Sequence, residues 1–518
     1  MLSFIRFLTL AILAAAVLIL ALRLIFPLPS LDGRSASTAR EADPGTPLGA
    51  QLLPQAASHP GLSGIFPLRA GAEAFAARIL LARAAQSTID AQYYIWQNDL
   101  TGIPLLQELR AAAERGVRVR LLVDDNGTPA LDAELAALNA LPNAEVRIFN
   151  PFNLRQPRLL SYAFDFFRLN RRMHNKSFTV DGAATIIGGR NIGDVYFARS
   201  EKSQYSDLDL LAVGKVVPDV AAEFDLYWNS RSAYPHELLV TPPADGLAGF
   251  DARLKEVEAD QGTADYAQAV AATRLVRDLI GGTLAFDWAE TTLVSDDPAK
   301  GLGPLPADRL LVGRLAAIVG EATRSIDLIS AYFVPGPRGT RLLTDAAARG
   351  VKVRTLTNSL EATDVLPVHA SYVKYRERLL KGGVDVYELR AEPGSKEAAD
   401  HLGILGSSAA SLHAKTFVLD DDRVFVGSFN FDPRSTFLNC EMGFLVRSPV
   451  LAAMMKATVD ADLAGAAWHV ERQPDGRLTW SAKAAGGGTE TRLYEPGTNL
   501  FKRVALTVLG LLPVEWMM

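Results

Sequence analysis

The sequence has a single cysteine, Cys440, and only seven histidines among its 518 residues. One cysteine forms no disulfide within the chain and offers no thiolate cluster for zinc, so we expect Cys440 to be a small buried residue. An excess of positive charge is also absent, since the formal net charge is −5. This balance argues against a broad electrostatic footprint for a polyanion such as DNA, and we expect no nucleic-acid partner.

The composition lacks the signature of disorder. Apolar residues make up 49% of the chain and charged residues 21%, which is typical of globular proteins. A chain of 518 residues exceeds the size at which one hydrophobic core stops growing. We therefore expect two structured lobes with additional segments.

Near the N-terminus, residues 7–26 are apolar apart from Thr9 and Arg23, and this run approaches the ~20 residues that cross a bilayer. We interpret residues 1–29 as an uncleaved membrane anchor; a cleaved signal segment is the alternative, although no clear small-x-small cleavage site is present. Residues 30–61 are rich in Pro, Gly, Ala and Ser, and we expect them to form a flexible stalk.

Two long segments carry the same order of structural signals. Residues 84–123 contain an apolar-aromatic strand pattern, a helical pattern that ends at Arg115-Gly116, and a second strand pattern. Residues 321–354 repeat this order, with Arg349-Gly350 at the end of the helix. A glycine after the last helical turn, followed by alternating apolar residues, is typical of a helix end and a strand start. The pattern predicts an α/β fold whose crossover helices favour largely parallel pairing.

Each repeat ends in the motif H-x-K-x-x-x-x-D, at residues 174–181 and 413–420. Residues two apart in a strand share a face, so the His and Lys of each copy project together. Each motif is followed by a glycine-containing run that ends in asparagine and then by an acid. The candidate catalytic residues are His174, Lys176, Asp181, Asn191, Asp207, His413, Lys415, Asp420, Asn430 and Glu441.

One His-x-Lys pair would most often be an exposed polar face, but two copies with identical spacing and the same following residues favour one shared active site. Cleavage of a phosphodiester needs a nucleophile, an acid for the leaving alkoxide, and cations for the phosphoryl oxygens. Two His, two Lys and two Asn supply this set, so we expect no metal and no other cofactor. Histidine suits both roles because its pKa of about 6.5 allows one neutral and one protonated ring.

Because neither lobe holds a complete nucleophile and acid set, the duplication predicts two lobes about a pseudo-two-fold axis with one shared active site. Each lobe is expected to be a mixed, largely parallel sheet flanked by helices. The expected segments are the first lobe at 62–240, a connecting segment at 241–285, the second lobe at 286–465 and a C-terminal segment at 466–518.

The duplicated motif resembles that of the phospholipase D superfamily. Within it the chain is similar to bacterial cardiolipin synthases through residues 90–96, 188–194 and 427–435. Residues 512–516 resemble the branch that uses a zwitterionic phospholipid as co-substrate. The resemblance covers residues 62–518.

The resemblance implies that one histidine attacks phosphorus to give a phosphatidyl-histidine while the other protonates the departing alcohol and then deprotonates the incoming hydroxyl. His174 is the nucleophile by analogy, although pseudo-symmetry allows the reverse. The motif Lys and Asn side chains would bind the phosphoryl oxygens, and Asp207 and Glu441 would orient the imidazoles of the opposite lobe. Asp181 and Asp420 belong to the motif, but their place on the opposite strand face from the lysines favours a structural role.

The resemblance predicts a cardiolipin synthase-like phosphatidyl transferase, with phosphatidylglycerol as acceptor and phosphatidylglycerol or phosphatidylethanolamine as donor. One alternative is a phospholipase D or nuclease-type phosphodiesterase that uses water; another is an inactive membrane-tethered lipid-binding protein, against which both intact motifs argue. The expected partners are phospholipid substrates and the membrane. The expected location is the bacterial inner membrane, with a single N-terminal anchor and the side left open.

Two further segments bear on the membrane. Residues 158–172 interleave aromatic residues with arginines, which suits entry of acyl chains, although a buried helix is equally compatible. The tail at 500–518 is expected to lie on the membrane as an interfacial helix, because Pro513 ends the helical pattern well short of the ~20 residues that span a bilayer. A docked segment that covers the core is the alternative.

Overall fold

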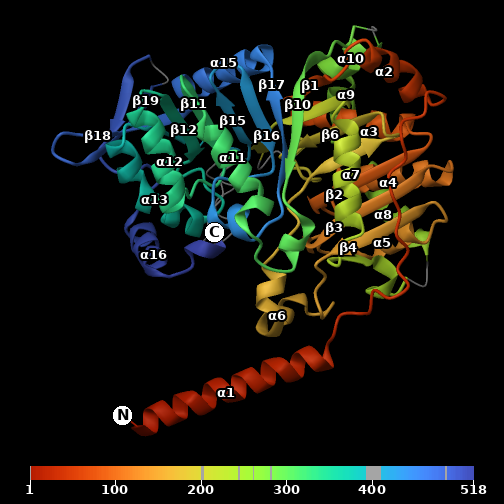
Figure 1. The fold of residues 1–518 in the computed structure, drawn as a ribbon, viewed down its shortest axis with the longest axis horizontal. Helices are drawn as coiled ribbons and strands as arrows, with labels where there is room; N and C mark the ends of the chain where they lie inside the picture. Colours follow the sequence, from red (N-terminus) through yellow and green to blue (C-terminus); the bar gives the residue numbers. More distant parts are fainter. Residues whose placement is uncertain are drawn as a thin grey trace.

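The protein has two lobes that lie side by side, with one extended sheet running through both (Figure 1). The computed structural model describes residues 2–199, 204–242, 246–260, 262–280, 283–391, 410–484 and 487–518.

The first lobe follows two N-terminal helices, α1 (Leu2–Ile25) and α2 (Pro47–Ala57). Its elements are β1 (Ser63–Leu68), α3 (Gly71–Ala84), β2 (Thr88–Ile95), α4 (Gly102–Glu114), β3 (Arg118–Gly127), α5 (Asp132–Asn139), β4 (Ala144–Phe149), α6 (Tyr162–Leu169), β5 (Ser177–Val180), β6 (Ala184–Gly188), β7 (Gln204–Ser206), β8 (Asp209–Gly214), α7 (Val217–Trp228) and β9 (Ala233–Pro235). The connecting helices α8 (Leu247–Glu258), α9 (Thr263–Ala271) and α10 (Arg274–Ile280) pack against helices of this lobe.

The second lobe repeats the first and then continues. Its elements are β10 (Asp287–Ser295), α11 (Leu311–Gly320), β11 (Ser325–Ser330), α12 (Gly336–Ala348), β12 (Lys352–Asn358), α13 (Leu366–Lys381), β13 (Asp385–Leu389), β14 (Ala410–Leu412), β15 (Lys415–Leu419), β16 (Arg423–Gly427), α14 (Pro433–Phe437), β17 (Met442–Arg447) and α15 (Pro449–Gly465). The strands β18 (Ala467–Arg472), β19 (Leu478–Lys483) and β20 (Thr489–Arg492) follow, and α16 (Leu500–Leu511) lies near the C-terminus.

The strand order shows the duplication. The first lobe has the order β9-β4-β3-β2-β5-β6-β8-β1, and the second has β18-β13-β12-β11-β15-β16-β17-β10 at the equivalent places. The equivalent strands β1 and β10 pair with each other in antiparallel register, with Gly64 opposite Trp288. Antiparallel pairing of equivalent strands is what a two-fold axis between them requires, so the predicted two-lobed α/β fold is confirmed.

The predicted preponderance of parallel pairing is wrong. In the large sheet, only the described pairs within β2-β3-β4 and β11-β12-β13 are parallel, and the other described pairs are antiparallel. Helices such as α4 and α12 cross over between the parallel strands, whereas tight turns join β5 to β6 and β15 to β16. A tight turn links only antiparallel neighbours, so the strands that follow each motif return antiparallel.

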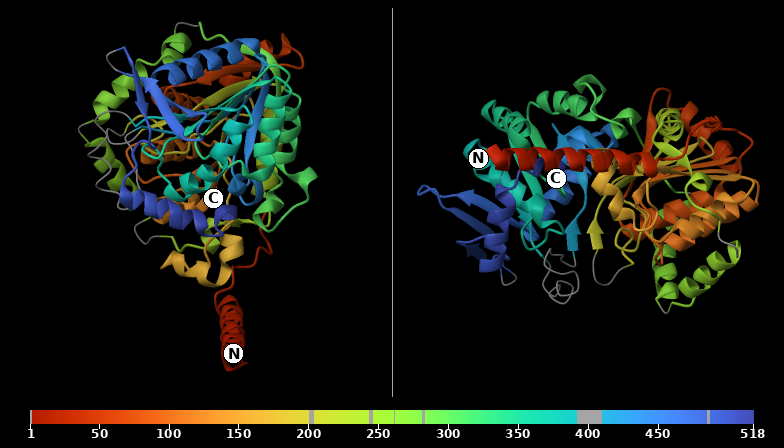
Figure 2. Two further views of the ribbon diagram at one scale, coloured as in Figure 1. Left: turned by 90° about the vertical axis from the view of Figure 1, so that its left-hand side faces the viewer. Right: turned by 90° about the horizontal axis from the view of Figure 1, so that it is seen from below.

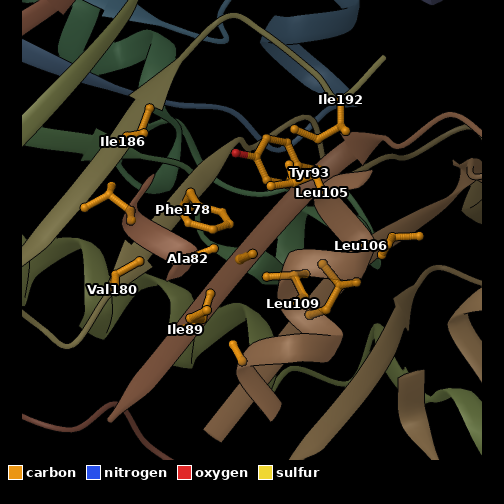
Figure 3. Close-up of a cluster of buried hydrophobic side chains, with 14 of the residues drawn as sticks. Ala82, Ile89, Tyr93, Leu105, Leu106, Leu109, Phe178, Val180, Ile186 and Ile192 are labelled. Carbon is orange, nitrogen blue, oxygen red and sulfur yellow. The ribbon is translucent and has the colours of Figure 1, made fainter. Parts of the chain in front are cut away.

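A buried cluster of the first lobe fixes the strands that lead to the first motif (Figure 3). Ile89 on β2 and Phe178 on β5 pack with Leu105 and Leu109 of α4, and all four are fully buried. Each such side chain contributes about 1.5–3 kcal/mol of hydrophobic stabilisation. The cluster holds β5 against β2, so the residues just before β5 have a fixed position.

The N-terminal helix α1 projects away from the two lobes (Figure 2). Its residues Ser3–Ile25 have a mean hydropathy of 2.7 and are long and apolar enough to cross a membrane. At its inner end, Arg23 pairs with Asp165 of α6 at 3.1 Å.

Residues 30–61 do not form the flexible stalk that their composition predicts. They contain α2, whose first turn is capped by Thr46, and they pack on the first lobe. The Arg34 guanidinium donates to the carbonyl oxygens of Ser230 and Ala233, both at 2.6 Å. The prediction failed because composition does not show that these polar side chains find partners on the lobe.

The second lobe continues past the boundary predicted after residue 465. Strand β18 pairs antiparallel with β13, and β19 and β20 extend the same sheet. The following helix α16 packs on α13, while Leu500 and Leu511 on it remain exposed. The last residues dock on the lobe, where the backbone N–H of Arg434 donates to the Met518 oxygen at 2.7 Å. The tail therefore combines a docked end with an exposed apolar helix.

Candidate active site

The two motif histidines each contact an acid from the opposite lobe. His174 Nδ1 lies 2.8 Å from Glu441 Oε2, and His413 Nδ1 lies 2.5 Å from Asp207 Oδ2. All four side chains are buried. The predicted pairing across the lobe interface is confirmed, and it leaves Nε2 of each ring free of the carboxylate.

The backbone at the interface produces this exchange. The N–H of His174 donates to the carbonyl of Cys440, and the Cys440 N–H donates to the carbonyl of Arg172, both at 2.8 Å. In the other direction, β7 pairs with β14, and the His413 N–H donates to the Ser206 carbonyl at 2.9 Å. Glu441 directly follows Cys440, which bonds to the first motif, and Asp207 directly follows Ser206, which bonds to the second. These backbone bonds place each acid beside the histidine of the opposite lobe. Cys440 is buried, as expected.

The glycine-containing runs make room for the acids in two different ways. A Cβ on Gly189 would lie 2.2 Å from Asp207 Oδ1, so only glycine fits beside this carboxylate. The equivalent residue of the second lobe is Ser428, whose hydroxyl donates to Glu441 Oε2 at 2.5 Å. Ser435 donates to Glu441 Oε1 at 2.8 Å. The serines thus fix both oxygens of Glu441.

The two lysines lie within electrostatic reach of both histidines. Burial lowers the pKa of Lys176 to about 7; Glu441 opposes this shift and Lys415 adds to it. Burial also lowers the pKa of Lys415, against the attraction of Asp207 and Glu441. Because charges from both lobes act on each lysine, the two motifs form one electrostatic cluster.

Burial keeps both imidazoles neutral in the free protein. It lowers the pKa of His174 to about 4, against the opposing effect of Glu441. Burial, with Lys415 next in size, lowers the pKa of His413 to about 4, against Asp207. A neutral ring that donates Nδ1–H to a carboxylate presents a lone pair on Nε2. Either ring is therefore suited to nucleophilic attack.

The motif asparagines are also buried. Asn191 accepts a hydrogen bond from the Ile95 N–H through Oδ1 at 3.2 Å. In the part of the chain that the structure describes, the side-chain oxygen of Asn430 is buried without a hydrogen-bond partner. Buried polar atoms without partners are uncommon, and a bound ligand is one way to complete them.

Asp181 and Asp420, the acids of the two motifs, bond to backbone N–H groups rather than to the imidazoles. The Asp181 carboxylate accepts the backbone N–H groups of residues 86–88 at the start of β2. Asp420 does the same for residues 323–325 before and at the start of β11. Both have positive φ, near +52°, which Asp tolerates in a tight turn. They tie each motif strand to its neighbour, as expected for the structural role that the strand geometry favours.

The family model described as "Cardiolipin synthase, PLD-like domain" matches residues 79–228 and 315–463, which together make up more than half of the chain. The chain belongs to the phospholipase D superfamily. One matched segment lies within each lobe, and each contains one copy of the motif.

Comparisons over most of the chain place it in the cardiolipin synthase branch. It is 46% identical over 471 residues to cardiolipin synthase C of Escherichia coli K12. The matched region covers 91% of this chain and 99% of that protein. It is 28% identical over 395 residues to a cardiolipin synthase of Staphylococcus aureus Mu50, covering 76% and 66%. The crystal structure of phosphatidylserine synthase from Haemophilus influenzae Rd KW20 has a TM-score of 0.55 at 15% identity, over 90% of this chain and 99% of that one. This last likeness shows the phospholipase D fold alone.

Sequence reasoning missed the aromatic residues of this phospholipase D site. Tyr94 lies edge-on to His174, with ring centroids 5.1 Å apart. Tyr205 stacks on His413 at 5.0 Å, and Tyr196 lies edge-on to it at 5.2 Å. Tyr205 is two residues before Asp207, and both contact His413. Residues two apart in an extended chain share a face, so this spacing could have identified Tyr205.

Among the residues that the structure describes, no group of three or more His, Cys, Asp and Glu side chains could hold a metal ion. The positive charge at the site comes from Lys176 and Lys415, which are both buried.

Proposed function

We propose that this protein is a cardiolipin synthase-like phosphatidyl transferase that uses phosphatidylglycerol as acceptor and phosphatidylglycerol or phosphatidylethanolamine as donor. The observation that carries the proposal is that each lobe supplies the carboxylate that contacts Nδ1 of the other lobe's histidine. Both imidazoles are buried and lie near two lysines. Glu441 and Asp207 each hold one Nδ1–H, so both Nε2 atoms are available to one phosphodiester.

In the first half of the proposed reaction, Nε2 of one histidine attacks phosphorus. A P–N bond forms, the P–O bond to the donor headgroup breaks, and Nε2–H of the other histidine gives its proton to the departing oxygen. The bound phosphodiester favours this protonated ring because it brings a negative charge next to it. In the second half, the other histidine takes the proton of the phosphatidylglycerol hydroxyl, whose oxygen displaces the first histidine from phosphorus.

The remaining polar groups of the site act on the phosphoryl oxygens. Lys176 and Lys415 supply positive charge where negative charge develops, and Asn191 and Asn430 supply amide groups. Their burial strengthens these interactions because little water competes with them. The donor therefore needs no metal to neutralise its phosphate.

The protein acts on phospholipids, and we propose that it works at the bacterial inner membrane with α1 as its anchor. Helices α1, α6 and α16 extend on the same side of the molecule in the first two figures. Exposed apolar side chains gather on α6 and α16 and on the residues next to these helices, and Phe166 contacts Trp516 with ring centroids 6.3 Å apart. The exposed residues are Leu159, Leu160, Phe167, Leu500, Phe501, Val504, Val508, Leu511, Leu512 and Trp516. An apolar surface of this kind suits contact with lipid.

The test is to incubate the purified full-length enzyme with labelled phosphatidylglycerol, with and without phosphatidylethanolamine, in EDTA, and to identify the products. The proposal predicts cardiolipin, with glycerol or ethanolamine as the released alcohol. A His174→Asn variant controls for contaminating activity. Phosphatidic acid as the sole product would show that water is the acceptor and would overturn the proposal.

A further inference from the structure

The surroundings of His413 and His174 differ, although the two motifs are related by pseudo-symmetry. On the His413 side, the stacked Tyr205 donates its hydroxyl to Asp364 Oδ2 at 3.3 Å. The Tyr332 hydroxyl donates to the same oxygen at 2.9 Å. Two tyrosines therefore fix one oxygen of Asp364 close to the His413 ring.

The other oxygen of Asp364 is buried and has no hydrogen-bond partner among the described residues. Asp364 also makes no ion pair in the described part of the chain. Its charge reaches the site, because Asp364 is one of the carboxylates that oppose the lowering of the Lys415 pKa. An ionised carboxylate oxygen that is buried without a donor is costly unless a ligand supplies one.

The carboxylate on the His174 side is already satisfied. Asp124 pairs with Arg172 at 3.0 Å and accepts the Met173 N–H at 2.9 Å. The Tyr94 hydroxyl there accepts from the Asn126 amide. Among the described residues, Asp364 on the His413 side therefore lacks the paired cation that Asp124 has on the His174 side.

We propose that Asp364, Tyr205 and Tyr332 form a subsite for the primary ammonium group of an aminoalcohol headgroup on the donor phospholipid. Oδ1 of Asp364 accepts a charged N–H, and the tyrosine rings add a favourable cation–π contribution. A two-carbon linker keeps this ammonium close to the ester oxygen that leaves. The inference rests on the proposed phosphatidyl transfer and assigns the residues that would recognise the phosphatidylethanolamine donor.

The subsite breaks the symmetry of the two histidines. A headgroup whose ammonium lies at Asp364 places its departing oxygen on the His413 side. His413 then protonates that oxygen, and His174 attacks phosphorus from the opposite side, in line with the breaking P–O bond. The products of this half-reaction are free ethanolamine and a phosphatidyl group on His174.

The test compares two donors that differ in charge but little in size, phosphatidylethanolamine and phosphatidylpropanol, in mixed micelles with the full-length enzyme. The readout is the ratio of kcat/KM for release of ethanolamine over propanol. We expect this ratio to favour ethanolamine in the wild-type enzyme. It should fall at least about tenfold in Asp364→Asn, because a neutral amide does not attract the ammonium charge as the carboxylate does. The matched control is Asp345→Asn, the same change at an exposed position on α12, which should leave the ratio unchanged.

Two results would overturn the ammonium subsite. One is a wild-type ratio near one, and the other is an equal loss on both lipids in Asp364→Asn, which would make Asp364 a positioning residue for Tyr205 and His413. Tyr332→Phe provides a second variant, with a smaller fall in the ratio expected. Headgroup release does not depend on the acceptor, so failure of the transfer proposal would be seen separately, as headgroup release without cardiolipin.

Discussion

Glu441 of the second lobe accepts a hydrogen bond from Nδ1 of His174 in the first lobe at 2.8 Å, across 267 residues of chain. A glutamine at this position can present its NH₂ group to Nδ1 and so stabilise the other tautomer, with the proton on Nε2. We expect Glu441→Gln to lower kcat by about 10²- to 10⁴-fold with little change in KM. Steady-state kinetics and a thermal unfolding curve measure this, with the exposed Glu256→Gln as control. A loss confined to KM would contradict the orienting role.

Asp181 and Asp420 provide the opposite case, in which a motif residue supports the fold. Asp181→Ala leaves the N–H groups of residues 86–88 without their carboxylate acceptor. We expect the free energy of unfolding to fall by about 3 kcal/mol, because such groups lose charge-assisted hydrogen bonds. Urea denaturation measures the loss. The kcat of the protein that remains folded should stay within about tenfold of the wild type, and a larger drop without destabilisation would restore a catalytic role.

The pH dependence should reflect Lys176. Its pKa is lowered by burial to about 7, so in the free enzyme the ammonium loses its charge as the pH rises through 7. The neutral amine binds phosphate less well, and we expect kcat/KM to fall on the alkaline side. His174, with a pKa of about 4, remains neutral as pH falls to about 5 and sets no limb in that range.

Lys176→Arg tests the assignment of this alkaline limb. Arginine stays protonated because its pKa exceeds 12. The residual activity of the variant should therefore keep its kcat/KM at high pH, whatever its absolute rate. An unchanged alkaline limb in Lys176→Arg would assign it to another group, such as Lys415 or the histidine that acts as the acid.

The exposed apolar residues of α16 should matter only at a lipid surface. Replacement of Phe501, Val508 and Leu511 by serine removes apolar area that lies outside the packed core. We expect kcat/KM to fall about tenfold or more on phospholipid vesicles, because contact with the bilayer loses hydrophobic free energy. Turnover of a soluble short-chain phosphodiester should be unchanged. Equal losses on both substrates would identify α16 as a structural brace.

The site could be predicted from the sequence because its chemistry is repeated at fixed spacing. The His-x-Lys pairs and the acids Asp207 and Glu441 follow from the duplication, and the resemblance supplied their exchange between lobes. Asp364 could not be found in this way, because its partners Tyr205 and Tyr332 come from different lobes and share no periodic pattern.

The fold was predicted less completely than the site. Sequence periodicity identified strands and crossover helices, but the pairing direction of β5 and β6 depends on a turn whose conformation is set by Asp181 at positive φ. Residues 30–61 were misjudged because composition cannot show that Arg34 finds carbonyl partners near residue 230. Long-range hydrogen bonds of this kind leave no local signal in the sequence.

The central claim is that both motif copies form one site, in which His174 is the nucleophile and His413 the acid and base. The most direct measurement uses the p-nitrophenyl ester of phosphatidic acid, whose leaving group needs no protonation, with His413→Ala and His174→Ala. In His413→Ala we predict a burst of about one nitrophenolate per chain followed by a stall, because the phosphatidyl-histidine forms but lacks its base. His174→Ala should give no burst. A burst in His174→Ala instead, or in neither variant, would contradict the account.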